Sequence, residues 1–280
     1  MGKSSLFPSV RIGTSGWIYP HWQGRFYPLE CPKAKWLEYY ARHFDVLELN
    51  VSFYRLPDAE TFRRWSARTP AGFIWTVKMN LYITHILRLK NVEEAMSRFY
   101  DAVSSLGDKL GPIVIQLPPS LIYENSLVRH FLGLLDLSRK HAIEVRHGSW
   151  MQDEFMELLR QHNVAFCISD TAGRYPMRTA VTADYVYLRL HGSRRLYASL
   201  YTEEELRGWA EMIRGWSRET WVFFDNDFEG NAVRNAIRFG MQYGCAKSAA
   251  EVHDDQTIRM DPEQLPLSVC IQNGDNEETS

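Results

Sequence analysis

The sequence predicts one α/β domain, a single (β/α)8 TIM-type barrel, over residues 10–244. Three observations predict it. Eight short strand-like segments alternate mostly with helical ones along this stretch, as in barrels of parallel strands. Nearly every one of these segments ends in a polar residue, and the catalytic groups of such barrels lie at the carboxyl ends of the strands. A doubly wound sheet is disfavoured because no strand is followed by a G-x-G-x-x-G or P-loop motif.

Five of the eight strands have a diagnostic pattern. The segments 46–50, 73–78 and 185–191 and the middle of 141–150 alternate apolar with polar side chains. GPIVIQLPP is an apolar run bounded by prolines, typical of a fully buried parallel strand. The predicted strands are Val10–Ser15, Val46–Asn50, Phe73–Lys78, Gly111–Pro119, the middle of His141–Trp150, Val164–Asp170, Tyr185–His191 and Thr220–Asn226.

Helical periodicity fills most of the connections between these strands. Three helices have the spacing of a capping box at their start, namely Asn91 with Glu94, Ser149 with Gln152, and Thr202 with Glu205. Further helices are predicted over about 33–43, 58–67, 124–137 and 231–243. Between Asp170 and Asp184 no helical period occurs, so the helix between strands six and seven is predicted to be short or missing.

The composition is typical of a globular protein without a global charge bias or a membrane span. The chain of 280 residues is 45% hydrophobic and 24% charged, with a formal net charge of −2, so a site for an anion must be local. The N-terminus has no apolar signal core, and no apolar run has the length of a membrane span. We therefore expect a cytoplasmic protein with no membrane partner. After Gly244 the chain turns polar and acidic, and residues 245–280 are predicted to be a disordered tail.

In a barrel, the polar strand ends converge on one mouth. Glu144 and Arg146 alternate with apolar residues, and a core accepts such charges only when they are paired. Glu144 is our choice for a general acid or base, because neighbouring charges and desolvation tune a carboxylate there. The predicted catalytic residues are Glu144, His191 and Asp170, and the predicted substrate-binding residues are Glu48, Asn50, Lys78, Gln116, Arg146, Arg189, Arg194, Asn226, Trp17, Tyr19 and His85.

The cations among these residues favour an anionic substrate. Lys78, Arg146 and Arg189 would orient the anion, and HGSRR follows the seventh strand, where barrels often bind phosphate. The first hypothesis is therefore an enzyme that acts on a small polar, anionic substrate, such as a phosphorylated sugar or a nucleotide fragment, by acid–base chemistry. Hydrolase, lyase and isomerase are not distinguished, and the sequence identifies no cofactor.

Two alternative functions use the same residues differently. A nucleic-acid-binding or processing module would stack bases on the aromatic loop that contains Trp17 and Tyr19, with HGSRR on the phosphates. That loop is equally typical of a cover packed by its own rings. A metal-dependent hydrolase or isomerase-like barrel would draw its ligands from Glu144, Asp170, His191 and Asp225, although nearby cations oppose a metal ion.

Two further interpretations concern the acidic residues. Glu144 and Glu48 would form a glycosidase pair if their carboxylates lay at a suitable separation. Alternatively, Arg146 and Arg189 neutralise both glutamates in a salt-bridge network, and the barrel then serves binding or regulation.

The chain also resembles a known family, the YecE-like proteins (domain of unknown function 72). The similarity covers Ile12 to about Tyr243 and lies in seven blocks: GTSGWIYPHWQGRFYP, LELNVSFYRLP, K-x-x-x-Y-I-T-H from Lys78 to His85, GPIVIQLPPS, IEVRHGSW, YLRLHG and the FFDN-x-x-x-G-N-A region. Family members often have an Asn pair where this chain has Asp225 and Asn226. The resemblance implies a TIM-type barrel with one short or missing helix, and it implies no reaction, substrate or cofactor.

Overall fold

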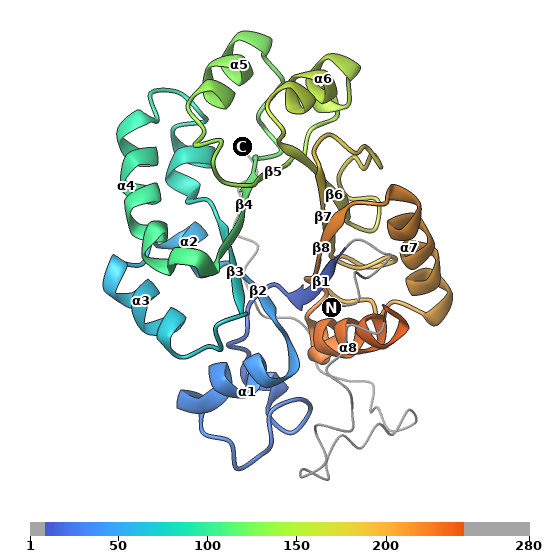
Figure 1. Ribbon diagram of the computed structural model, residues 1–280. Helices are drawn as coiled ribbons and strands as arrows, with labels where there is room; N and C mark the ends of the chain where they lie inside the picture. Colours follow the sequence, from blue (N-terminus) through green and yellow to red (C-terminus); the bar gives the residue numbers. More distant parts are fainter. Residues whose placement is uncertain (1–8, 244–280) are drawn as a thin grey trace, which may run out of the picture.

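The computed structural model describes residues 9–243, which form a barrel of eight parallel strands (Figure 1). The strand order is β1-β8-β7-β6-β5-β4-β3-β2, and every neighbouring pair is parallel. The strands are β1 Val10–Thr14, β2 Val46–Leu49, β3 Ile74–Lys78, β4 Leu110–Gln116, β5 His141–Glu144, β6 Ala165–Asp170, β7 Tyr185–Leu190 and β8 Glu219–Phe224. The predicted TIM-type barrel is confirmed.

The seam between β1 and β2 nearly closes the barrel. It consists of a bridge between Ser15 and Glu48, with the amide of Gly16 donating to the carbonyl of Glu48 at 2.8 Å. Gly13 makes this approach possible, because a Cβ atom at that position would lie 2.3 Å from the carbonyl oxygen of Val46. The seam thus brings the Glu48 side chain inside the barrel beside Ser15.

Helices surround the strands and separate them from solvent (Figure 1). They are α1 Trp36–His43, α2 Val51–Tyr54, α3 Ala59–Ala67, α4 Glu93–Val103, α5 Asn125–Gly133, α6 Asp153–Gln161, α7 Glu203–Trp216 and α8 Asn231–Tyr243. Short helical turns lie at η1 Pro20–Trp22, η2 Lys33–Lys35, η3 Tyr82–Ile86, η4 Ser104–Lys109, η5 Gly148–Trp150 and η6 Phe228–Gly230. Residues 171–184 contain no helix, so the predicted gap between β6 and β7 is confirmed.

One of the three predicted capping boxes forms. Thr202 and Glu205 cap α7 reciprocally, as expected. The box of Asn91 with Glu94 is wrong: Asn91 has a left-handed backbone with φ of 51°, which an N-cap does not adopt, and α4 starts at Glu93. The box of Ser149 with Gln152 is also wrong, because Ser149 belongs to η5 and the amide of Gln152 donates to its carbonyl.

Apolar side chains fill both sides of the strands. The lower interior of the barrel is packed by one buried cluster: Val46, Val114, Ala142, Ala165, Cys167, Tyr185, Tyr187, Trp221 and Phe223. The larger cluster lies between the strands and the helices. It includes the rings of the loop after β1, where Tyr27 stacks on Trp36 with ring centroids 4.6 Å apart. This packing favours the interpretation of the loop as a cover.

Two further predictions concern membrane spans and the C-terminal tail. Among residues 9–243 no helix is long and apolar enough to span a membrane. The predicted disordered tail, residues 245–280, lies outside the described residues.

Candidate functional site

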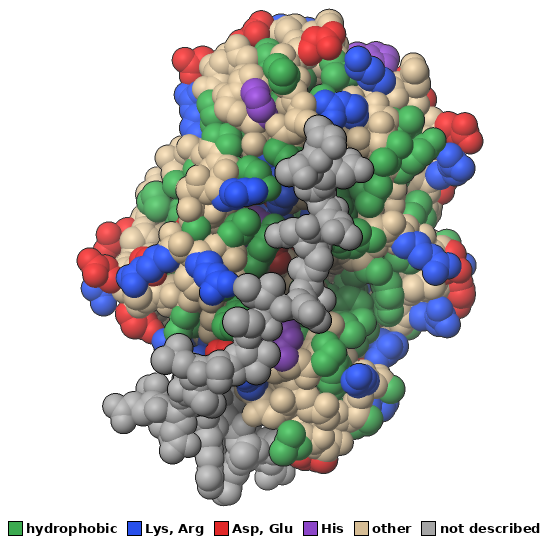
Figure 2. All heavy atoms as spheres, turned by 180° about the vertical axis from the view of Figure 1, so that it is seen from behind, with side chains coloured by type: hydrophobic (Ala, Val, Ile, Leu, Met, Phe, Trp, Pro, Cys, Tyr) green, Lys and Arg blue, Asp and Glu red, His purple; other side chains and the backbone are tan. Residues whose placement is uncertain are grey.

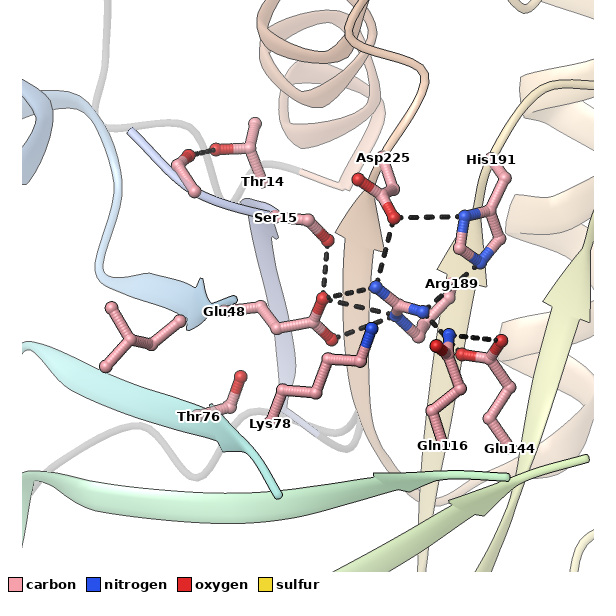
Figure 3. A network of polar contacts seen from close by, with 12 residues as sticks. Thr14, Ser15, Glu48, Thr76, Lys78, Gln116, Glu144, Arg189, His191 and Asp225 are labelled. Atoms are coloured by element: carbon pink, nitrogen blue, oxygen red, sulfur yellow. Dashed lines mark hydrogen bonds and ion pairs between the residues drawn. The ribbon is translucent and has the colours of Figure 1, made fainter. Parts of the chain in front are cut away.

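Polar side chains occupy the interior of the barrel above the apolar cluster (Figure 3). Strand alternation places them there, since the same strands that send Val46, Val114 and Ala142 inward send Glu48, Gln116 and Glu144 inward two residues later. We call the set the polar ring: Glu48, Lys78, Gln116, Glu144, Arg189 and Asp225.

Arg189 is the centre of the polar ring. Its side chain is 1% exposed. Its Nη2 donates to Glu48 at 2.7 Å and to Asp225 at 3.0 Å, and its Nε donates to Glu48 at 3.0 Å. Its Nη1 donates to Glu144 in a short contact. One guanidinium therefore joins carboxylates from three strand ends.

Both buried glutamates accept additional hydrogen bonds. Glu48 accepts from the hydroxyl groups of Ser15 at 2.5 Å and Tyr187 at 2.6 Å. Glu144 accepts from the amide of Gln116 at 2.8 Å and from Nε of Arg146 at 3.1 Å. Both oxygens of Glu48 and of Glu144 thus accept hydrogen bonds, as buried charges require.

The cations set the protonation state of Glu144. Burial alone would raise the pKa of Glu144, but Arg189 and then Arg146 hold it well below its usual value. Burial likewise acts to raise the pKa of Asp225, and the hydrogen bond from His191 and the charge of Arg189 lower it. Both groups are ionised at neutral pH. Glu144 is therefore poorly suited to donate a proton, which is one of the two roles, general acid or base, that the sequence suggested.

His191 is held against the polar ring by Asp225. Its Nδ1 lies 3.0 Å from Oδ2 of Asp225, and its Nε2 lies 3.4 Å from Nη1 of Arg189. The ring of Tyr197 packs edge-on against the imidazole. A carboxylate that orients one nitrogen of a histidine fixes its tautomer, so the Nε2 that faces Arg189 is the nitrogen that carries the lone pair.

Lys78 differs from the other cations of the mouth. Its side chain is 7% exposed, and its Nζ lies 3.9 Å from the ring centroid of Phe53. In the described part of the chain it has no carboxylate within ion-pair distance and no hydrogen-bond acceptor. Burial, and next the charge of Arg189, lower the pKa of Lys78 to about 8.

His85, Tyr19 and Asn50 lie at the edge of the site. The imidazole of His85 packs edge-on against Phe53, and burial together with the charge of Lys78 lowers its pKa to about 4. The hydroxyl of Tyr19 donates to the carbonyl of Ser15 at 2.6 Å. Oδ1 of Asn50 is buried and has no hydrogen-bond partner among the described residues.

The mouth positions predicted for Asp170 and Asn226 are corrected. Ser169 in β6 and Asp225, just after β8, occupy inward positions, so the side chains of their neighbours Asp170 and Asn226 point to the other face. Asp170 accepts from the hydroxyl of Tyr201 at 2.9 Å. Asn226 donates to the carbonyl of Ser199 and to Asn235, both at 2.9 Å, and so holds the loop after β7.

The expected roles of Trp17 and Arg194 are also corrected. Trp17 is 6% exposed and packs edge-on against Trp65 and Trp75 in the outer core, away from any ligand surface. Arg194 is 76% exposed and lies 3.9 Å from Glu205. The amides of Arg194 and Arg195 both donate to the hydroxyl of Ser199, which occupies the N–H groups that HGSRR would offer a phosphate.

These placements weaken the nucleic-acid and metal alternatives. Figure 2 shows the molecule from behind the view of Figure 1. On the described part of that face, Lys and Arg side chains are dispersed among hydrophobic and acidic ones and form no continuous basic stripe. The four side chains considered as metal ligands are divided, because Asp170 faces away while Glu144 and Asp225 bind Arg189. Residues 9–243 contain no group of three or more His, Cys, Asp or Glu side chains arranged for a metal ion.

Sequence reasoning missed Asp227, just beyond β8. Its carboxylate accepts from Nε1 of Trp22 at 2.6 Å, and Nε2 of His21 lies 2.9 Å from its other oxygen. The side chain is 16% exposed, and burial raises its pKa to about 7. The only sequence signal was a third acidic or amide residue in the run Asp225-Asn226-Asp227. An acid with this pKa can give or take a proton near neutral pH.

Comparison with known proteins identifies relatives along most of the chain. The family described as "Protein of unknown function DUF72" matches residues 11–259. The UPF0759 protein YunF of Bacillus subtilis is 24% identical over 299 residues, 92% of this chain and 99% of YunF. The UPF0759 protein YecE of Escherichia coli K12 is 30% identical over 139 residues, 49% of this chain and 48% of YecE. The match to YecE thus spans about half of that relative.

Solved structures give the same picture of the fold. The crystal structure of a DUF72 family protein from Thermotoga maritima has a TM-score of 0.76 and 32% identity, covering 84% of this chain and 99% of that one. A D-psicose 3-epimerase, solved in the presence of D-fructose, has a TM-score of 0.51 and 12% identity, covering 83% of this chain and 98% of that one. The likeness to the epimerase concerns the barrel fold alone.

Replacing Arg189 tests the charge pairing of the polar ring. Arg189→Met leaves Glu48 and Glu144 buried without their main counter-charge, so we expect a loss of about 3–5 kcal/mol in the free energy of unfolding in urea. Arg63→Met, which removes an exposed partner of Glu60 on α3, is the control and should change stability by less than about 0.5 kcal/mol. Equal, small effects of the two substitutions would contradict the pairing.

Asp227 gives a prediction for pH dependence. Its pKa is about 7 in the folded protein against an ordinary 3.8, so between these values the unfolded chain releases a proton that the folded protein keeps. Stability therefore falls as the pH rises through this window. Asp227→Asn keeps an acceptor for Trp22 and should be more stable than the parent by about 1–3 kcal/mol at pH 8, and by much less near pH 4. A difference independent of pH in urea unfolding would refute the assignment.

Proposed function

This chain belongs to the DUF72 family, and we propose that it is an enzyme acting by acid–base chemistry on a small anionic substrate bound at the mouth of its barrel. The observation that carries the proposal is the unequal pairing of the cations there. Arg189 forms ion pairs with three carboxylates, whereas the amine of Lys78 has no counter-ion among the described residues. A buried, unpaired cation is costly unless a ligand supplies the charge.

Arg146 is the second candidate for contact with the anion. It gives Nε to Glu144, and its Nη2 has only a 3.5 Å contact with the hydroxyl of Tyr197. Its guanidinium lies over the ring of Tyr175 at 4.6 Å, which fixes its plane. A phosphate or carboxylate group between Lys78 and Arg146 would meet donors from the ends of β3 and β5, on either side of β4.

Proton transfer is assigned to His191 and Asp227, with Glu144 holding the cations in place. Asp225 fixes the imidazole of His191, and Asp227 has a pKa of about 7. An acid with a pKa near neutral pH and an oriented imidazole are groups that general acid–base catalysis uses. Glu48, Gln116 and Glu144 instead position Arg189 and Arg146.

Binding of glycerol 3-phosphate tests the anion site. At low ionic strength we expect saturable heat of binding by calorimetry, with none for glycerol. Lys78→Met and Arg146→Met should each weaken the affinity about tenfold or more, a change of about 1.4 kcal/mol. Arg139→Met removes the same charge from a pair with Asp136 before β5 and is the matched control.

The affinities of the three variants distinguish a specific anion site from a general effect of charge. Weakened binding in both mouth variants, with Arg139→Met unchanged, supports the site. Absence of binding to the parent protein, or an equal loss in all three variants, would show that the cations of the mouth do not form an anion site.

A further inference from the structure

The lysines of the described chain differ in what holds their amines. Lys109 donates to the carbonyls of Ser66 at 2.5 Å and Thr69 at 2.7 Å. Lys140 forms a short ion pair with Glu219. The amine of Lys78 is recessed in the barrel and contacts the face of Phe53, with no such acceptor among residues 9–243. No carboxylate or carbonyl in that part of the chain holds the amine in its protonated form.

The surroundings of Lys78 ease the loss of that proton. Arg189 and Arg146 oppose a positive charge on the amine, while Glu144 and Asp225 favour it and are already bound to the two arginines or to His191. The imidazole of His85, which packs edge-on against Phe53, carries no charge at neutral pH, because burial and then the charge of Lys78 lower its pKa to about 4. A free amine is the reactive form of a lysine nucleophile, and burial is the usual way to obtain it.

We propose that Lys78 is a nucleophile that forms an imine with the aldehyde or ketone group of a small phosphorylated substrate. The inference rests on the proposed function, since the same mouth would hold the phosphate. It narrows the substrate class from small anions to carbonyl compounds that carry an anionic group.

The step balances without an oxidant or a further reactant. The lone pair of Nζ attacks the carbonyl carbon, and the C–N bond forms as the carbonyl π electrons move to oxygen. The oxygen takes up the proton that the ammonium released to free its lone pair, together with one of the two protons left on the nitrogen. It leaves as water when the C–O bond breaks, and the nitrogen keeps its last proton as the C=N bond forms. A protonated amine and a carbonyl compound thus give an iminium ion and water, and the single positive charge is conserved. The charge balance of the polar ring is unchanged.

The ring of Phe53 fits this intermediate. An iminium ion at the position of Nζ keeps its contact with the aromatic face at 3.9 Å. The removal of a proton beside the iminium carbon, or the cleavage of a bond there, is the chemistry that such an electron sink makes accessible. Asp227 or His191 would be the group that exchanges this proton.

Reductive trapping tests the proposal. The full chain is incubated with glyceraldehyde 3-phosphate and sodium borohydride, whose hydride converts the C=N bond to a stable amine, and the adduct is located by peptide mass mapping. We expect one adduct per chain, on the peptide that contains Lys78. The rate of its formation should rise with pH to a midpoint near 8, the pKa of Lys78. Glycerol 3-phosphate, which differs by lacking the carbonyl group, should slow it by competition.

Two variants complete the test. Lys78→Arg keeps the positive charge and should give no adduct at residue 78 while still binding glycerol 3-phosphate. Lys109→Arg is the matched control and should be trapped as fast as the parent protein. If glycerol 3-phosphate binds but the parent is not trapped, or is trapped equally at exposed lysines such as Lys35, the imine is refuted and the anion site stands. If neither ligand binds, both proposals fail.

Discussion

The interaction on which the rest of the site depends is the contact of one guanidinium with three carboxylates. Arg189 meets Glu48, Glu144 and Asp225 inside the barrel, where isolated charges are expensive to bury. Each carboxylate comes from a different strand end, so the contact also fixes how β2, β5 and β8 lie around β7. The planar, forked shape of arginine suits this task, whereas a lysine ammonium is a single point charge.

That arrangement divides the mouth into fixed and available groups. Glu48 and Glu144 accept donors on both oxygens, and Arg189 uses all three of its nitrogen atoms on acidic partners. These groups hold their geometry and protonation state. Asp225 orients His191 beside them. Burial and the fixed charges shift the pKa values of Lys78 and Asp227 toward neutrality. Pre-organised charge of this kind is what barrel enzymes use to stabilise transition states.

The barrel and the centre of the site could be predicted from the sequence because both follow from strand alternation. Charges at every second position of an apolar strand, as at Glu144 and Arg146, have to face a common interior. The same rule failed at Asp170 and Asn226, since each lies one residue out of phase with Ser169 and Asp225, and only the strand register shows that.

Contacts between distant parts of the chain could not be predicted from the sequence. Nothing in the local pattern indicates that Trp22 and His21, in the loop after β1, meet Asp227 after β8. The pairing of Arg189 with three carboxylates, which leaves Lys78 without one, is likewise a property of the closed barrel. The left-handed backbone of Asn91, which removed a predicted cap, is likewise not indicated by the local sequence pattern.

The central claim is that the fixed charges leave Lys78 as a recessed amine without a counter-ion. Titration of the protein with ¹⁵N-labelled lysine, followed by NMR and assigned with Lys78→Arg, measures this amine directly. The account predicts a pKa of about 8 for Lys78, against the ordinary 10.5. A value at or above 10.5 would show that a carboxylate or another acceptor holds the amine in its charged form, and would contradict the account.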